Sequence, residues 1–177
     1  MIFINGIHGS GKSYLCEKIK ADCNIPIYTA SQLISEYKNE LYNSNKFVDH
    51  IDDNQHALIE KVKSIGINTQ FILDGHLCLL NNQGEICRIN ENVIIQLNPT
   101  LILTKISDIH KICERLKNRD NKNYEVEFLE KFQNDEIEYA KELSLKLKIK
   151  QLTINDDFDE EKIIEIIRSV QINGRSI

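Results

Sequence analysis

The chain has 177 residues, of which 41% are hydrophobic, and a formal net charge of −5. This length and apolar content suit a single domain with a substantial core. The acidic balance, without any block of Lys or Arg, argues against binding to bulk nucleic acid or a membrane surface, and no apolar run approaches the roughly 20 residues of a membrane-spanning helix.

A glycine-rich stretch lies between the first two predicted elements. A short apolar run over 1–4 predicts a strand, and the spacing of Leu15 and Ile19 predicts a helix over 14–20. Between them, residues 6–13 contain the pattern G-x-x-x-x-G-K-[ST] of a phosphate-binding loop. Glycines in such a loop let backbone N–H groups converge on a phosphate, and the helix N-terminus adds partial positive charge. A chance glycine-rich turn is the alternative, but it does not explain the flanking strand and helix.

This loop predicts the nucleotide contacts and part of a metal site. Lys12 is placed to reach the β- and γ-phosphates, and the Ser13 hydroxyl to bind Mg²⁺. His8 stands at a variable position of the loop, which favours a mainly structural role. We expect the following residues to contact the nucleotide: Gly6, His8, Gly9, Ser10, Gly11, Lys12, Ser13 and Tyr14.

Two helical patterns follow a short extended run at 25–28. The first runs from Ser31, a good N-cap, to residue 41, and the second covers 48–65 and is stopped by Gly66. Because these helices lie between strand-like segments, we expect them to form an acceptor-side lobe over about 29–67.

The next apolar run, 71–73, ends in Asp74. Such a run predicts a buried parallel strand whose carboxylate emerges at the edge where the phosphate loop opens. We therefore expect Asp74 to hold Mg²⁺ together with Ser13; an Asp in a surface turn is the alternative. Gly75, and not a Glu that could activate water, follows Asp74, which favours a kinase over an ATP hydrolase.

The second half of the chain continues the alternation of strands and helices. A hairpin is predicted at 77–80 and 86–89, and further strands at 101–104 and 151–154. The five cysteines form no C-x-x-C pair, which predicts reduced thiols and a cytoplasmic location. The alternation predicts an α/β fold, a parallel sheet with helices on both faces, in a single domain over 1–177.

Helices complete this half. Ser107 or Asp108 is expected to cap a helix on which Arg115 and Arg119 share a face. A polar break over 119–123 predicts a short lid within about 115–127. A long helix over 125–147 and a final helix with apolar residues at 163–167 follow.

With these residues in place, the chain resembles P-loop kinases of the nucleoside-monophosphate-kinase group. It is most similar to the small archaeal-type adenylate kinases and their bacterial ATP-binding relatives. The resemblance rests on the phosphate loop, on Leu73-Asp74-Gly75-His76, on the polar turn at 82–84, on 101–119 with its arginine pair, and on Tyr139-Ala140.

The resemblance implies the three-layer P-loop fold, bound ATP and Mg²⁺, and transfer of the γ-phosphoryl group to a small acceptor, a nucleotide or nucleoside. Lys12, Asp74, Arg115 and Arg119 would be catalytic. Arg115 would contact the adenine or a phosphate, and Arg119 would close over the γ-phosphate. A solvated basic helix face is the other interpretation of this pair. The backbone near 155–156 would border the adenine.

The acceptor side departs from this family. Monophosphate kinases grip the acceptor phosphate with arginine, but no arginine precedes Arg88, and carboxylates outnumber lysines in the predicted lobe. Either Arg88 reaches the acceptor from the hairpin, or the acceptor carries no phosphate there. His76 would lie beside the acceptor, or it is a hydrogen-bonded hairpin histidine.

Two other functions stay open from the sequence. A regulatory ATP-binding protein that hydrolyses slowly within an assembly needs the same phosphate loop. A kinase of nucleic-acid ends also needs it, although the acidic charge and the lack of a basic groove count against this function.

Overall fold

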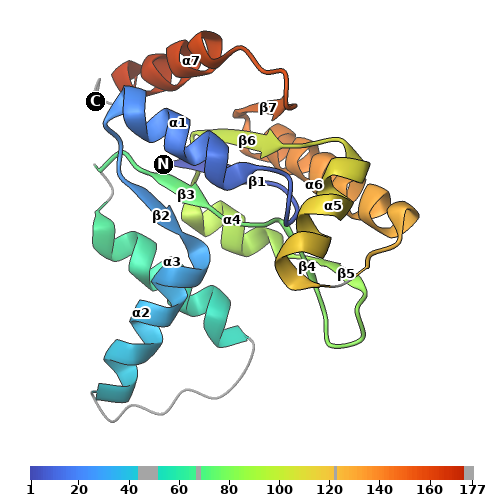
Figure 1. Ribbon diagram of the computed structural model, residues 1–177. Helices are drawn as coiled ribbons and strands as arrows, with labels where there is room; N and C mark the ends of the chain where they lie inside the picture. The colour runs from blue at the N-terminus through green and yellow to red at the C-terminus, as the bar shows by residue number, and fades with distance from the viewer. Residues whose placement is uncertain (44–51, 67–68, 122, 174–177) are drawn as a thin grey trace.

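The computed structural model describes residues 1–43, 52–66, 69–121 and 123–173. Its centre is a five-stranded, fully parallel sheet (Figure 1). The strands, in spatial order, are β2 (Ile27–Thr29), β3 (Ile72–Asp74), β1 (Ile2–Asn5), β6 (Leu101–Lys105) and β7 (Lys150–Ile154). The predicted α/β fold with a parallel sheet is therefore confirmed.

Helices cover both faces of this sheet. In β1, Ile2 and Ile4 pack in one apolar cluster with α1 (Lys12–Cys23) and α7 (Glu160–Asn173), whereas Phe3 packs in the other. Successive side chains of a strand point to opposite faces, so one short apolar run supplies both cores. The second cluster is completed by α4 (Glu91–Leu97), α5 (Ile109–Asp120) and α6 (Val126–Leu147).

A helix pair stands at the β2 edge of the sheet (Figure 1). It consists of α2 (Ala30–Asn43) and α3 (Asp52–Ile65), which pack against each other. The predicted first turn of the second helix, 48–51, lies outside the described residues. The predicted N-cap Ser31 is wrong, because α2 begins one residue earlier and Thr29 Oγ1 accepts the hydrogen bond from Gln32 N at 3.2 Å.

The hairpin is confirmed as β4 (Cys78–Leu80) and β5 (Ile86–Arg88). Helix α4, which follows it, was not expected from the sequence. Asn90 caps α4 by accepting a hydrogen bond from Asn92 N, and Val93, Ile94 and Leu97 are buried. The Asn90 cap and the spacing of the three buried residues are the sequence features that would have predicted α4.

The polar break expected from 119 begins later. Asp108 caps α5 through Lys111 N, and the helix runs to Asp120, where Asn121 ends it with a φ of 52°. Arg115 and Arg119 are therefore both helical, one turn apart. No helix in the described part of the chain is long and apolar enough to cross a membrane.

Candidate functional site

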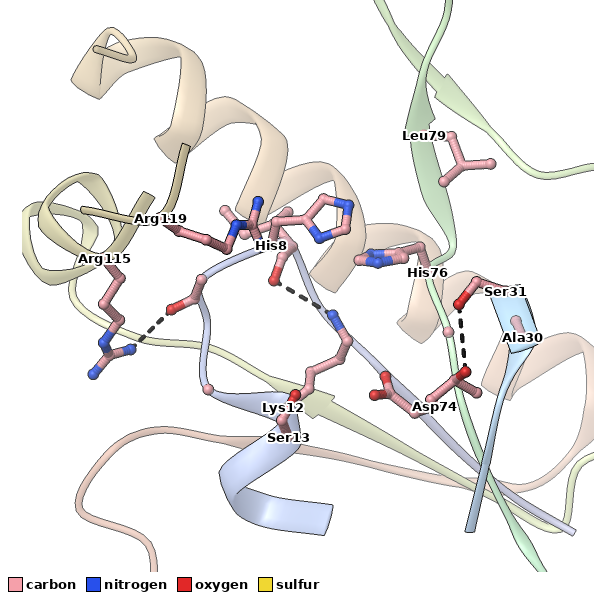
Figure 2. A pocket seen from close by; sticks show the side chains of 15 residues that line it. His8, Lys12, Ser13, Ala30, Ser31, Asp74, His76, Leu79, Arg115 and Arg119 are labelled. Carbon is pink, nitrogen blue, oxygen red and sulfur yellow. Dashed lines mark hydrogen bonds between the residues drawn. The ribbon is translucent and has the colours of Figure 1, made fainter. Parts of the chain in front are cut away.

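A cavity of about 560 Å³, which we name the phosphate cavity, opens at the carboxyl ends of β1 and β3. Its walls come from the loop after β1, the start of α2, the loop after β3 and one face of α5 (Figure 2). The expected site residues that line it are His8, Gly9, Gly11, Lys12, Ser13, Asp74, His76, Arg115 and Arg119. Segments more than 100 residues apart thus meet at one sheet edge, as parallel strands require.

The loop between β1 and α1 is shaped by its glycines. Gly6 has a φ of 146°, and a Cβ there would lie 2.3 Å from the carbonyl oxygen of Lys105. Gly11 has a φ of 93° directly before the first residue of α1. Both positions therefore exclude other side chains. Ser10 is fully buried, and neither Gly6 nor Ser10 lines the cavity.

Lys12 places its ammonium inside this loop. Its Nζ donates to the carbonyl oxygen of Gly6 at 2.7 Å and reaches that of Ile7 at 3.5 Å, and only 8% of the residue is exposed. Burial lowers the pKa of Lys12, and the nearby Asp74 carboxylate opposes this shift. The loop carbonyls thus hold the cation where an anionic ligand of the cavity would meet it.

Asp74 ends β3, in register with Ile4 of β1. Burial raises the pKa of its carboxyl group, while Lys12 and His76 act in the opposite direction. Ser13 and Asp74 both line the cavity, and a hydroxyl and a carboxylate oxygen are ligands that suit Mg²⁺. No cluster of three or more His, Cys, Asp or Glu side chains in the described residues could hold a metal by itself. The donor set therefore fits an ion that is shared with phosphate oxygens.

We expect Asp74→Asn to raise the free energy of unfolding of the nucleotide-free protein at about pH 7. A raised carboxyl pKa means that the folded chain binds the proton more tightly than the unfolded chain. The resulting stability is fully present below the ordinary pKa of 3.8 and is lost as pH rises through the folded value. The gain of the variant should therefore shrink as pH falls toward about 3. Urea unfolding across pH measures this, with the exposed Asp157→Asn as control; a loss of stability at pH 7 would contradict it.

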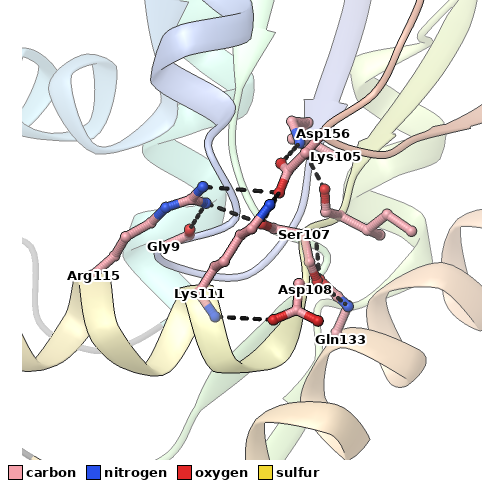
Figure 3. Close-up of polar contacts among 9 residues, drawn as sticks. Gly9, Lys105, Ser107, Asp108, Lys111, Arg115, Gln133 and Asp156 are labelled. Carbon is pink, nitrogen blue, oxygen red and sulfur yellow. Dashed lines mark hydrogen bonds and ion pairs between the residues drawn. The ribbon is translucent and has the colours of Figure 1, made fainter.

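Arg115 ties α5 to the phosphate loop. Its Nη1 donates to the carbonyl oxygen of Gly9 at 2.9 Å and to Ser107 Oγ at 3.1 Å, and its Nη2 lies 3.8 Å from the Asp156 carboxylate (Figure 3). Hydrogen bonds from Lys105 and Ser107 lower the pKa of Asp156 against the opposing effect of burial. Arg115 is thus held at the loop by two hydrogen bonds and one ion pair.

A second cavity of about 400 Å³ lies on the other side of Arg115. Its lining includes Gly11, Tyr14, Asp156 and Phe158. Tyr14 is 54% exposed and lines this second cavity. It does not line the first cavity, at the phosphate loop. The segment after β7, where the sequence placed the adenine, thus borders a hollow that adjoins the phosphate loop.

Glu136, which was not among the expected site residues, is fully buried on α6. Its carboxylate accepts from Asn5 Nδ2 at 2.6 Å and from the backbone N–H groups of Leu77 and Cys78, each at 3.1 Å. It thereby holds the loop that follows Asp74. An acidic residue in step with the buried residues of α6 was the available signal.

His76 lies between this carboxylate and the cavity. Its ring centroid is 4.4 Å from that of His8, and its Nδ1 is 3.8 Å from Glu136 Oε1 without a hydrogen-bond partner. Figure 2 shows both imidazoles at the cavity wall opposite Arg115. The structure therefore brings His76 to the phosphate cavity.

The network extends across the sheet edge. Thr104 Oγ1 donates to Asn5 Oδ1 at 2.9 Å, and Gln151 Nε2 donates to Thr104 Oγ1 at 2.9 Å. Together with Glu136 these side chains join β7, β6 and β1 to α6 beneath the phosphate loop.

Arg88, the residue expected to reach the acceptor, also lies away from the phosphate cavity. It pairs with Glu142 at 2.7 Å, and its guanidinium lies 4.9 Å from the centre of the Tyr139 ring. It does not line the phosphate cavity. The hairpin thus directs Arg88 toward α6.

Comparisons with known proteins agree with this fold. The model of the AAA domain family matches residues 5–133. No curated protein matches the chain. The chain is similar to shikimate kinase from Acinetobacter baumannii in complex with shikimate, at a TM-score of 0.54 and 8% identity, with 99% of this chain and 94% of that chain covered.

Two further structures show the same likeness. A candidate kinase from Chloroflexus aurantiacus has a TM-score of 0.55 at 13% identity, with 98% of this chain and 96% of that chain covered. A sugar kinase from Janibacter sp. HTCC2649 has a TM-score of 0.52 at 12% identity, with 98% and 94% covered. These identities show the fold alone, and they support the P-loop kinase part of the expected resemblance without its adenylate-kinase part. Since the family match spans most of the chain, including the phosphate loop, Asp74 and the arginine pair, the chain belongs to the AAA domain family and has the α/β fold of P-loop kinases.

Proposed function

We propose that this protein is an ATP-dependent phosphotransferase that moves the γ-phosphoryl group of ATP to a hydroxyl group of a small acceptor. Nucleosides and nucleotides are the first acceptors to test. The observation that carries this proposal is the convergence of Lys12, Arg115 and Arg119 on one cavity with the Asp74 carboxylate. Phosphoryl transfer requires positioning and charge neutralisation more than covalent chemistry from the protein.

The residues divide this work. The Lys12 ammonium gives up its hydrogen bonds to the loop carbonyls and binds the β- and γ-phosphates instead. The loop N–H groups hold the phosphates in place. Ser13 and Asp74 would hold Mg²⁺, which would supply positive charge to neutralise the phosphates. Arg119 lines the same cavity from α5 and stabilises the charge that spreads over the γ-phosphoryl oxygens.

Transfer to an acceptor is favoured over hydrolysis by the cavity lining. Among the described lining residues, Asp74 is the only carboxylate, and Gly75 follows it. No second carboxylate of the described lining is therefore available as the general base that would activate water. A regulatory ATP-binding protein with slow hydrolysis is the competing outcome.

Calorimetry with ATP, with and without Mg²⁺, tests the first half of the proposal. The second half is tested by transfer from γ-labelled ATP to nucleosides, nucleotides and short oligonucleotides. We expect tight Mg²⁺-dependent binding and a labelled small-molecule product. Phosphate release at one rate regardless of acceptor would favour the regulatory protein, and absence of ATP binding would contradict the proposal.

Arg119→Ala is expected to lower kcat on the order of 100-fold, with a smaller effect on the KM for ATP. A cation that acts on transition-state charge stabilises the transition state more than the bound substrate. Steady-state kinetics measure the split. Lys117→Ala, an exposed residue of α5 outside the cavity lining, serves as the control. An unchanged kcat would assign Arg119 to the solvated face of α5.

A further inference from the structure

A third cavity, of about 180 Å³, adjoins the phosphate cavity. It lies among α2, α3 and α4, and the two cavities share Ala30, Ser31, Gly75, His76 and Leu79 as lining residues. A molecule in this cavity would therefore meet the phosphate cavity at a rim that carries the Ser31 hydroxyl and the His76 imidazole. We name this space the lobe cavity.

The walls of the lobe cavity are mainly apolar. They include Ile34, Leu58 and Ile94, and the carboxamides of Asn54 and Gln55 are the polar groups that α3 adds. None of its described lining residues is a Lys, Arg, Asp or Glu. A ligand that enters the lobe cavity would contact hydrocarbon side chains and the neutral carboxamides of Asn54 and Gln55.

Three cations of the lobe and the hairpin pair with carboxylates outside the lobe cavity. Lys61 lies 2.6 Å from the Glu40 carboxylate, Lys63 lies 2.8 Å from Glu60, and Arg88 pairs with Glu142. The other described cation of the lobe and hairpin, Lys38 on α2, does not line the lobe cavity. An anionic group in the lobe cavity would thus be buried without a counterion, which is costly.

We propose that the acceptor is an uncharged hydroxyl compound whose least polar part, such as a planar ring, fills the lobe cavity. This inference rests on the proposed phosphotransferase function and names its substrate class. A carboxamide offers both donors and an acceptor, so Asn54 and Gln55 match a neutral edge such as that of a heterocycle. Nucleosides belong to this class, whereas acceptors that carry a phosphate or carboxylate at the end away from the reacting hydroxyl do not.

The acceptor hydroxyl lies at the shared rim, where it faces the γ-phosphate. Its oxygen forms the new P–O bond, and the bond to the bridging oxygen of ATP breaks with its electron pair on ADP. The hydroxyl proton passes to a non-bridging oxygen of the transferred phosphoryl group.

A binding experiment with matched probes tests the charge preference without any turnover. Benzyl alcohol and benzoate differ little in shape but differ in charge. In titrations followed by amide NMR, we expect benzyl alcohol to shift the signals of Leu58 and Ile94, and benzoate to shift them only at concentrations at least about 10-fold higher. Equal or tighter binding of benzoate, or no shift with saturating benzyl alcohol, overturns the inference.

A charge substitution gives the matched variant. Gln55→Arg places a guanidinium at the lobe cavity, and we expect it to improve benzoate binding at least about 10-fold relative to benzyl alcohol. His56→Arg puts the same side chain on the neighbouring exposed position of α3, outside the lining, and should leave both probes unchanged. Equal effects of the two variants would overturn the inference.

Turnover separates this inference from the proposed function. We expect kcat/KM for benzyl alcohol to exceed that for 4-(hydroxymethyl)benzoate, whose carboxylate would enter the lobe cavity, on the order of 100-fold. Efficient transfer to 4-(hydroxymethyl)benzoate with poor transfer to benzyl alcohol overturns the neutral-acceptor inference and leaves the phosphotransferase intact. Probe binding in the lobe cavity without any ATP binding would instead reject the phosphotransferase.

Discussion

Lys12→Ala is expected to reduce phosphoryl transfer on the order of 1,000-fold or more while the chain stays folded. Lys12 is the one expected phosphate ligand whose cation is already inside the loop, 2.7 Å from the Gly6 carbonyl oxygen. Its loss removes the charge that compensates the γ-phosphate during transfer. Initial rates with labelled ATP and thermal unfolding of the same sample measure the two halves of this prediction.

A matched control keeps the Lys12→Ala result specific. Lys18 lies on the same helix, is 40% exposed and pairs with Glu160 at 3.2 Å, so Lys18→Ala should keep wild-type turnover. Full turnover in Lys12→Ala would refute the phosphotransferase. Because burial lowers the pKa of Lys12, removal of the ammonium is also expected to cost the apo protein little stability.

Glu136→Ala is expected to lower the free energy of unfolding by about 3–5 kcal/mol. The fully buried carboxylate accepts hydrogen bonds from the Asn5 side chain and from the backbone of Leu77 and Cys78. Truncation leaves these donors without partners and opens a hole beside them. Urea unfolding followed by far-UV circular dichroism measures the change.

Two further variants make the Glu136 result decisive. Glu136→Gln keeps one oxygen and the volume, so it should lose less stability than the alanine variant and remains measurable if alanine prevents folding. Glu138→Ala, an exposed carboxylate on the same helix, should change stability by less than about 0.5 kcal/mol. A loss below about 1 kcal/mol in Glu136→Ala would show that water satisfies the donors.

The elements nearest the phosphate loop were predictable because their signals are local. The pattern from Gly6 to Ser13 fixes loop, helix start and cation within eight successive positions, and the apolar run before Asp74 fixes a strand and its polar end. The parallel sheet then brings both to one edge. The loop pattern and the strand pattern can each be recognised without information about distant contacts.

Glu136 was out of reach for the opposite reason. Its partners lie 131 and 59 residues away in the sequence, at Asn5 and Leu77, so no local pattern marks the carboxylate as a hydrogen-bond hub. The orientation of Arg88 was hidden in the same way, because the twist and packing of the hairpin, and not its residue order, turn this side chain toward Glu142.

The hydrogen bonds that Glu136 accepts from Asn5 and from the loop after β3 affect how the protein folds during its synthesis. A ribosome has made the whole phosphate loop by residue 13 and Asp74 soon afterward, yet Asn5 and the loop after β3 obtain their shared acceptor only when Glu136 on α6 emerges. Loop closures of this length are slow relative to local helix formation. A nascent chain that still lacks α6 therefore carries both nucleotide motifs in an unfinished pocket, and its competence to bind nucleotide arrives late in synthesis.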